Sequence, residues 1–124
     1  MATNKIIRFG PVALTTAYTL NIINCEITAI TGPIGYTQTQ PYLIIRHIRI
    51  VNTSATAATF RLFVGASAGN AAGSEFMGYN TTVPSNSYID WYGTLRLDST
   101  DFLVGGASAS AALTLQAEGE IGFA

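Results

Sequence analysis

Apolar and polar residues alternate with a period of two along most of this chain. The C-terminal segment shows the pattern most clearly, with apolar residues at Leu113, Leu115, Ala117, Ile121 and Phe123 and polar ones at Thr114, Gln116, Glu118 and Glu120. Shorter alternating runs surround Phe60 and Trp91. Because successive side chains of a strand point to opposite faces, each run predicts a β-strand with one face toward a core and one toward water.

Clusters of turn-forming residues separate these runs. They are Asn52-Thr53-Ser54, Gly65 to Ser74, Pro84 to Ser87, Asp98 to Asp101 and Gly105-Gly106. No apolar stripe with helical spacing continues for three turns, so the chain is expected to be all-β. Short strands joined by such turns predict an antiparallel sandwich or barrel of about eight strands. We expect them at roughly 12–15, 18–28, 42–52, 58–65, 76–80, 87–92, 94–104 and 111–123.

The length of the chain predicts a single domain. Its 124 residues are enough for one hydrophobic core and too few for two. We therefore expect one β-sandwich over residues 1–124. Residues 1–10 precede the first expected strand and are a candidate N-terminal arm.

The segment Tyr42–Asn52 is unusual because both of its faces are apolar. Simple alternation puts Leu43, Ile45 and Val51 on one face and Ile44, Ile48 and Ile50 on the other. A strand with two apolar faces needs cover on both sides. The cover could be the long segment 29–40 or a neighbouring subunit, and Arg46, His47 and Arg49 would then be half-buried near a rim.

Charged residues are few. They make up 10% of the sequence, with a formal net charge of −1, against about 25% charged residues in an ordinary soluble domain. Such a surface repels neighbouring molecules weakly, which suits a protein that is normally covered by partners. The six Lys and Arg residues are scattered, and this argues against nucleic-acid binding.

The chain offers neither a disulfide nor a membrane span. Cys25 is the sole cysteine, so we interpret it as a small buried apolar residue. No stretch approaches the ~20 apolar residues that a membrane-spanning helix needs. We expect no membrane partner.

Two patterns resemble hydrolytic sites. Residues Gly65–Gly69 match the G-x-S-x-G nucleophile elbow around Ser67, but the elbow requires a following helix and a later His, whereas His47 comes earlier. A flexible hairpin loop explains the same letters. Glu118 and Glu120 share a strand face at about 7 Å, a spacing known from glycosidases, yet two exposed glutamates on a terminal strand need no special explanation.

The sequence contains only weak candidates for metal binding and for glycosylation. His47 has no second His or Cys pair to complete a metal site, so we expect it to be hydrogen-bonded to its neighbours. Asp98 and Asp101 lack the EF-hand spacing and are interpreted as turn caps. The N-glycosylation sequons that begin at Asn52 and Asn80 are interpreted as turns. No catalytic residue, cofactor or metal is predicted, and the protein is expected not to be an enzyme.

Three aromatic residues lie close together in the chain. Trp91 is in phase with Ile89 and is predicted to pack in the core. Tyr88 and Tyr92, on the opposite face with Asp90, are predicted to be exposed contact residues. An alternative reading makes Tyr88, Trp91 and Tyr92 a sugar-binding platform.

Three segments resemble small virion structural proteins of tailed bacteriophages. They are Leu43–Ser54, a strand ending in Asn-Thr-Ser; Val83–Gly93, a Pro-Ser-Asn turn leading into the Trp91 strand; and Ala112–Gly122, a closing alternating strand. The likeness begins at Leu43. Residues 29–41, with Gly32-Pro33 and Gly35, are interpreted as an inserted loop.

The resemblance implies a jelly-roll-like β-sandwich and a place in the virion, assembled in the host cytoplasm. The expected role is a head decoration (cement) protein, often a homotrimer, that binds the major capsid protein or other virion proteins. The alternative is a neck, tail or fibre protein that binds a host glycan or receptor. Candidate interface residues are Ile7, Phe9, Arg46, Arg49, Tyr88 and Tyr92, together with the arm Thr31–Gln40.

Overall fold

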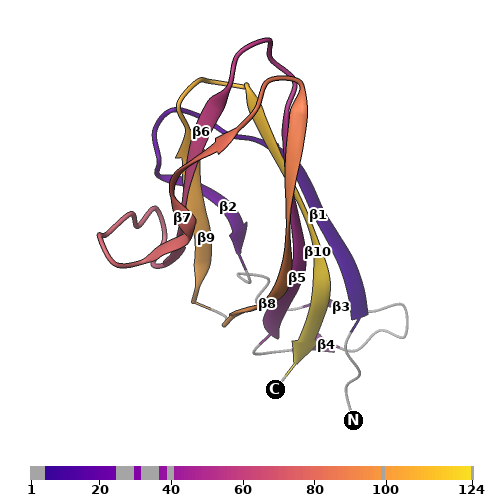
Figure 1. The fold of residues 1–124 in the computed structure, drawn as a ribbon. Coiled ribbons are helices and arrows are strands. Elements are labelled where there is room, and N and C mark those ends of the chain that lie inside the picture. Colours follow the sequence, from indigo (N-terminus) through magenta and orange to yellow (C-terminus); the bar gives the residue numbers. More distant parts are fainter. Residues whose placement is uncertain (1–4, 25–29, 32–36, 39–40, 99, 124) are drawn as a thin grey trace.

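A computed structural model describes residues 5–24, 30–31, 37–38, 41–98 and 100–123, and within these residues the regular structure is β-strand. Two four-stranded sheets face each other (Figure 1). The strands of the first sheet are β1 (Lys5–Ala13), β10 (Leu113–Phe123), β5 (Pro41–Asn52) and β8 (Ser87–Leu97). Those of the second are β2 (Leu20–Asn24), β9 (Phe102–Ala107), β6 (Ala58–Gly65) and β7 (Glu75–Val83).

The order of the strands defines the fold. The first sheet runs β1-β10-β5-β8 and the second β2-β9-β6-β7, and every described pairing is antiparallel. Most consecutive strands of the two sheets, such as β1 and β2 or β5 and β6, lie in different sheets, whereas β6 and β7 are neighbours in the second sheet. This is the double Greek-key arrangement of a jelly roll, and it confirms the predicted antiparallel β-sandwich.

The core lies between the two sheets. Its buried side chains come from inward positions of both, and include Leu43, Ile48, Phe60, Leu62, Leu103 and Leu115. Burial alternates along β6 and β10 as the sequence pattern predicts. The described residues contain no helix with the length and apolar character that crossing a membrane requires.

The strand β5 does not have two apolar faces, contrary to the sequence-based prediction. Leu43, Ile45, Ile48 and Ile50 are all fully buried on the core side. The register against β10 passes from Ile45 directly to His47, so Arg46 is an extra residue that shifts the alternation by one position. Ile44 is therefore only half-buried on the outer face, and this strand needs no second cover to explain its isoleucines.

The first strand begins earlier than predicted. Residues 5–10, expected to be an arm, belong to β1 and pair with β10 from Lys5↔Ile121 onward. At Gly10-Pro11 the strand continues, and the register merely shifts between Phe9 and Val12. Because β1 is an edge strand, proline can be accommodated there at such an irregularity. Residues 1–4 lie outside the described part of the chain.

The predicted strand 94–104 is also wrong, because a turn divides it. Strand β8 continues to Leu97 and β9 starts at Phe102. The amide of Asp98 donates to Asp101 Oδ2 at 2.9 Å, and the amide of Asp101 donates to the carbonyl oxygen of Asp98 at 2.9 Å. The expected turn cap is confirmed, and it ends the strand.

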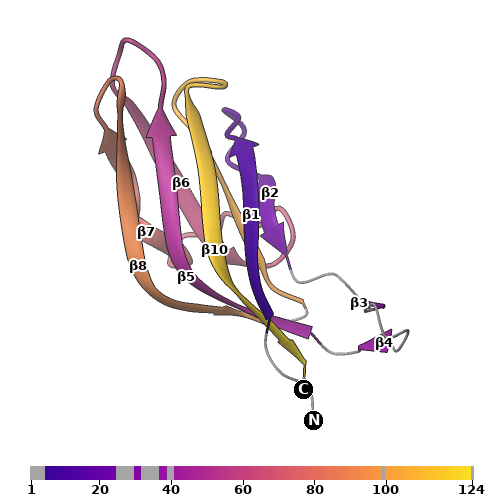
Figure 2. The ribbon, with the colours of Figure 1, turned by 90° about the vertical axis from the view of Figure 1, so that its right-hand side faces the viewer.

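The inserted loop 29–41 is described only in part. Two short strands, β3 (Ile30–Thr31) and β4 (Thr37–Gln38), pair with each other beside the end of the sandwich where β1 begins (Figure 2). Residues 25–29, 32–36 and 39–40 lie outside the described residues, and with them Cys25 and most of the Thr31–Gln40 arm.

Candidate interaction surface

The outward face of the β1-β10-β5-β8 sheet gathers most of the predicted interface residues. Arg46 and Arg49 come from β5, and Tyr88 and Tyr92 come from the neighbouring edge strand β8. The pairing of β5 with β8 sets Arg49 opposite Asp90, with Tyr88 and Tyr92 flanking it along β8. We call this set of outward side chains, with Ile6, His47, Glu118 and Glu120, the outer surface.

Asp90 is the centre of a hydrogen-bonded network on this surface. Arg49 donates to its two carboxylate oxygens, from Nε at 2.8 Å and from Nη2 at 3.2 Å. Nε2 of His47 lies 2.9 Å from Oδ1 of the same carboxylate. Hydrogen bonding from Arg49 lowers the pKa of Asp90 from 3.8 to about 2, and His47 contributes to the same shift. The carboxylate therefore raises the pKa of Arg49 in turn.

Both exposed tyrosines of β8 rest on this network. The guanidinium carbon of Arg49 lies 4.6 Å from the centre of the Tyr88 ring. The ring of Tyr92 stacks on His47 with centroids 4.5 Å apart and an interplanar angle of 12°. Tyr88 is nevertheless 55% exposed and Tyr92 70% exposed, which confirms that they face solvent. The rings are thus held in place while most of their surface stays available for contact.

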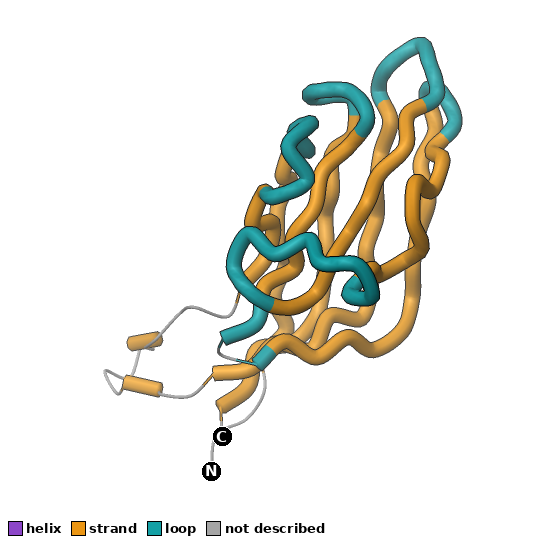
Figure 3. The backbone as a smooth tube through the Cα atoms, turned by 90° about the vertical axis from the view of Figure 1, so that its left-hand side faces the viewer, coloured by secondary structure: helices purple, strands orange, loops and turns teal. Residues whose placement is uncertain are grey.

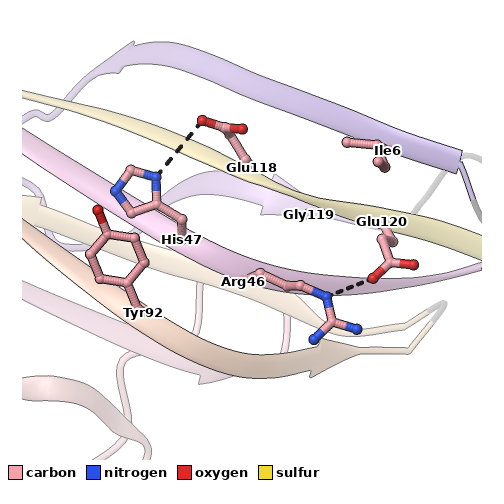
Figure 4. Close-up of a pocket in the computed structure, with 7 residues that line it drawn as sticks. All are labelled: Ile6, Arg46, His47, Tyr92, Glu118, Gly119 and Glu120. Carbon is pink, nitrogen blue, oxygen red and sulfur yellow. Dashed lines mark hydrogen bonds and ion pairs between the residues drawn. The ribbon is translucent and has the colours of Figure 1, made fainter.

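A hollow of about 580 Å³ lies beside Tyr92. Figure 4 shows its walls: Arg46 and Glu120 form an ion pair across 2.6 Å, and Nδ1 of His47 lies 3.8 Å from a carboxylate oxygen of Glu118. Ile6 of β1, 84% exposed, closes one side. The floor at Gly119 carries no side chain. A Cβ there would overlap the carbonyl oxygen of Ile44, so the bulge in β5 and the glycine in β10 depend on each other.

Ile7 and Phe9 do not belong to this surface. Both are half-buried and pack against the core, whereas their neighbours Ile6 and Arg8 are exposed. The sequence of β1 is apolar at both Ile6 and Ile7, so alternation alone left its phase open. Only the pairing of β1 with β10 decides it.

The sequence singled out other members of the surface without connecting them. Glu118 and Glu120 were interpreted as two exposed glutamates with no special role, but β10 lies between β1 and β5 and brings them to His47 and Arg46. The expected hydrogen-bonded state of His47 is confirmed. Alternating opposite charges on β5 and β10 were the available signal, and they could be used only once the two strands were known to be neighbours.

The aromatic residues of β8 divide between the two faces as predicted. Trp91 is half-buried, packs against the core and meets Phe76 of the other sheet edge-on, with ring centroids 5.0 Å apart. It therefore does not share a face with Tyr88 and Tyr92. A sugar platform made of all three rings is not formed.

The other candidate sites have structural roles. Ser67 accepts a hydrogen bond from Asn21 Nδ2 at 3.0 Å, which ties the loop after β6 to β2. Asn52 is 1% exposed; it donates to the carbonyl oxygens of Thr56 and Val83 and accepts from the amide and hydroxyl of Ser54. Over the described ranges, no group of three His, Cys, Asp or Glu side chains is placed to hold a metal ion.

No family model matches the chain, and no curated protein matches it. Among solved structures, the chain is similar to the Eiger TNF of S. frugiperda, with 10% sequence identity, 98% of this chain and 92% of that chain covered, and a TM-score of 0.42. The class of the protein is accordingly given by its own strand order: a jelly-roll β-sandwich with an ordered polar and aromatic face.

Proposed function

We propose that this chain is a non-enzymatic virion structural protein, a decoration (cement) protein that binds and stabilises the capsid of a tailed bacteriophage. The observation that carries the proposal is the outer surface, where Arg49, Asp90 and His47 form one network with exposed tyrosines resting on it. The resemblance in the segments around Asn52, Trp91 and Glu118 supplies the kind of assembly. The protein's location is then the virion.

The composition of the outer surface suits a protein partner. Tyrosine and arginine are enriched at interfaces and among the residues that carry most binding energy. Association usually costs free energy because flexible side chains become ordered. Here Arg49, Tyr88 and Tyr92 are already held by contacts within the chain, so this cost is reduced. The rest of the surface carries few charges, so electrostatic repulsion between closely packed neighbouring molecules is weak.

We also propose that three copies of this chain form a homotrimer. The homotrimer then binds the major capsid protein. A trimer places several copies of the outer surface on the lattice at once, and the second contact then forms at a high effective concentration. Sedimentation equilibrium of the purified protein measures its state. A monomer at all concentrations would remove the trimer from the proposal.

Binding to undecorated phage heads tests the main proposal. Wild-type protein should co-sediment with the heads and raise their resistance to heat or chaotrope. The double change Tyr88→Ala and Tyr92→Ala should weaken binding by at least about tenfold, because interface tyrosines often contribute about 2 kcal/mol each. Thr82→Ala, an exposed position on β7 of the other sheet, is the control. Wild-type protein that ignores the heads would contradict the proposal.

The alternative, a glycan-binding neck, tail or fibre protein, has less support. It requires Tyr88, Trp91 and Tyr92 on one face as a platform, with Asp90 free to bond the hydroxyls of a sugar. Trp91 packs against Phe76 instead, and the Asp90 carboxylate already accepts hydrogen bonds from Arg49 and meets His47. Binding of Tyr92→Ala and wild-type protein to a glycan array would still distinguish the two roles.

A further inference from the structure

The opposite sheet carries a second cluster around Arg61 that has no part in the proposed role. The guanidinium carbon of Arg61 lies 4.2 Å from the centre of the Tyr79 ring and 4.5 Å from that of Tyr18. Its Nε donates to Asn80 Oδ1 at 2.7 Å. Two rings and one amide therefore fix the orientation of a single cation on the outer face of the β2-β9-β6-β7 sheet.

The backbone around Arg61 is bent to hold these partners. Along β6, the residues Phe60, Arg61 and Leu62 pair with Thr81, Tyr79 and Phe76 of β7, so β7 has extra residues on both sides of Tyr79. Met77, Asn80 and Tyr18 have positive φ values of 64°, 54° and 56°; asparagine tolerates this conformation, but for Met77 and Tyr18 it is unfavourable. Strain of this kind persists only where the surrounding structure enforces it, and it is concentrated at functional sites.

A hollow of about 450 Å³ opens beside the cation. Its lining includes Tyr18, Arg61, Phe63, Asn70, Glu75 and Tyr79. Phe63 is 3% exposed and belongs to a small buried cluster with Phe102 and Val104, so the base is firm and apolar. Figure 3 views this side of the molecule, where the loop between β6 and β7 lies in front of the sheet.

The loop that borders the hollow is anchored on both sides. Asn21 of β2 accepts a hydrogen bond from the amide of Ala68 at 2.7 Å and donates to Ser67. At the other end Glu75 accepts from the amide of Gly73 at 2.7 Å, and Val64 donates to the carbonyl oxygen of Ser74. The hollow is therefore bordered by an attached loop on one side and by the tyrosines on the other.

The chemistry of the hollow favours a carboxylate. Among the residues that the structure describes, Nη1 and Nη2 of Arg61 make no hydrogen bond, so the planar fork that suits a carboxylate is unused. Glu75 adds one negative charge to the lining, and this charge opposes a dianion such as a phosphate monoester more than a monoanion. Asn70 and Glu75 can bond hydroxyl groups, while the aromatic rings suit the apolar face of a compact ring.

We propose that this hollow, the Arg61 pocket, binds a monocarboxylate of monosaccharide size, namely a uronic acid. Its carboxylate pairs with the free edge of the Arg61 guanidinium, its ring lies against Tyr18 or Tyr79, and its hydroxyls meet Asn70 and Glu75. A volume of about 450 Å³ lies within the usual range for small-ligand sites. The site is on the opposite sheet from the outer surface, so its success or failure is independent of capsid binding.

Calorimetric and NMR titrations of the wild-type protein test the ligand class. Glucuronate should bind at least about tenfold more tightly than glucose, which lacks the carboxylate, and than acetate, which lacks the ring. Glucose 6-phosphate should bind more weakly than glucuronate because of Glu75. Equal binding of glucose and glucuronate, tighter binding of the phosphate, or no binding of glucuronate would each overturn the proposal.

Variants then locate the site. Arg61→Met and Arg61→Lys should both reduce glucuronate affinity to that of glucose, since lysine keeps the charge but not the fork, and Tyr79→Phe should retain binding because the ring remains. Arg96→Met is the matched control, because Arg96 also lies over a tyrosine ring, that of Tyr42, and pairs with Asp98. A natively folded Arg61→Lys protein that keeps full glucuronate affinity would overturn the assignment.

Discussion

At the scale of single residues, Asp90 organises the outer surface. The protein has only seven acidic residues. This one holds the side chains of Arg49 and His47, and these in turn hold the rings of Tyr88 and Tyr92. Its side chain is 18% exposed, so the carboxylate is partly removed from water but fully hydrogen-bonded. A charged group in that position remains stable only while its partners stay in place.

The lowered pKa of Asp90 makes part of the stability depend on pH. The folded pKa of about 2 lies below the ordinary 3.8, so the contribution is complete above 3.8 and is lost as the pH falls through about 2. Asp90→Asn removes this titration. In urea unfolding between pH 5 and pH 2, the free-energy gap between wild type and Asp90→Asn should be largest at the upper end and shrink as the pH falls. A gap that stays constant would contradict the network.

Asn52 is a second residue on which a local structure depends. It is fully buried and links the end of β5 to the carbonyl oxygens of Thr56 and Val83. Asn52→Ala removes a hydrogen-bond partner from the buried carbonyl oxygen of Val83 and from part-buried groups of Thr56 and Ser54, and a buried group left unsatisfied costs about 1–3 kcal/mol. We expect a loss of more than about 2 kcal/mol in the free energy of unfolding, measured by chemical denaturation. Thr53→Ala, at an exposed neighbour, should change it by less than about 0.5 kcal/mol.

At the scale of elements, one extra residue in β5 determines what the first sheet presents. Without the bulge at Arg46, Ile48 and Ile50 would point to the same side as Ile44, away from the core. With it, four apolar residues of β5 are buried together and His47 and Arg49 turn outward. The bulge is also where β10 carries Gly119, so two strands share one irregularity.

Replacing Gly119 should therefore disturb the pairing of β5 with β10. A Cβ would meet the carbonyl oxygen of Ile44, which is backbone and cannot move aside cheaply. We expect Gly119→Ala to lower the free energy of unfolding by more than about 2 kcal/mol. Gly73→Ala is the matched control: nothing lies within 4 Å of its Cβ position, but its φ of 98° should cost about 1 kcal/mol. Equal effects would argue against a steric role for Gly119.

At the scale of the whole molecule, the two sheets share one core and should unfold together. Phe60 of β6 is fully buried between the sheets, and Trp91 of β8 contacts Phe76 of β7 across them. The main core is therefore shared by both sheets, and among the described residues only the small cluster of Phe63, Phe102 and Val104 belongs to the second sheet alone. The outer surface and the Arg61 pocket lie on the two outer faces and leave this core undisturbed.

Truncation of Phe60 tests this cooperativity. Phe60→Ala removes a large buried side chain and should cost about 3–5 kcal/mol. Trp91 fluorescence reports on the first sheet and far-UV circular dichroism on both. The two transitions should stay coincident and shift together in the variant. Separate transitions would show that the sheets unfold as independent units.

How much the sequence could predict differs between the fold and the surface. Period-two alternation identified most strands, the inward Trp91 and the outward Tyr88 and Tyr92, and clusters of turn-forming residues identified the turns at Asn52 and Asp98. Alternation placed residues 5–10 in an arm, because Ile6 and Ile7 are both apolar and give no clear pattern. It assigned β5 two apolar faces because a single inserted residue reverses the phase of everything after it.

By itself, then, the sequence determined an all-β domain, the inward and outward positions of the regular strands, and the scarcity of charge. Local side-chain chemistry and strand periodicity act over a few residues, and they suffice for those features. The tertiary structure alone decided which strands are neighbours. Asp90 meets His47 and Arg49, and Glu120 meets Arg46, across separations of 41 to 74 residues. Such contacts depend on sheet order and register, which alternation does not encode.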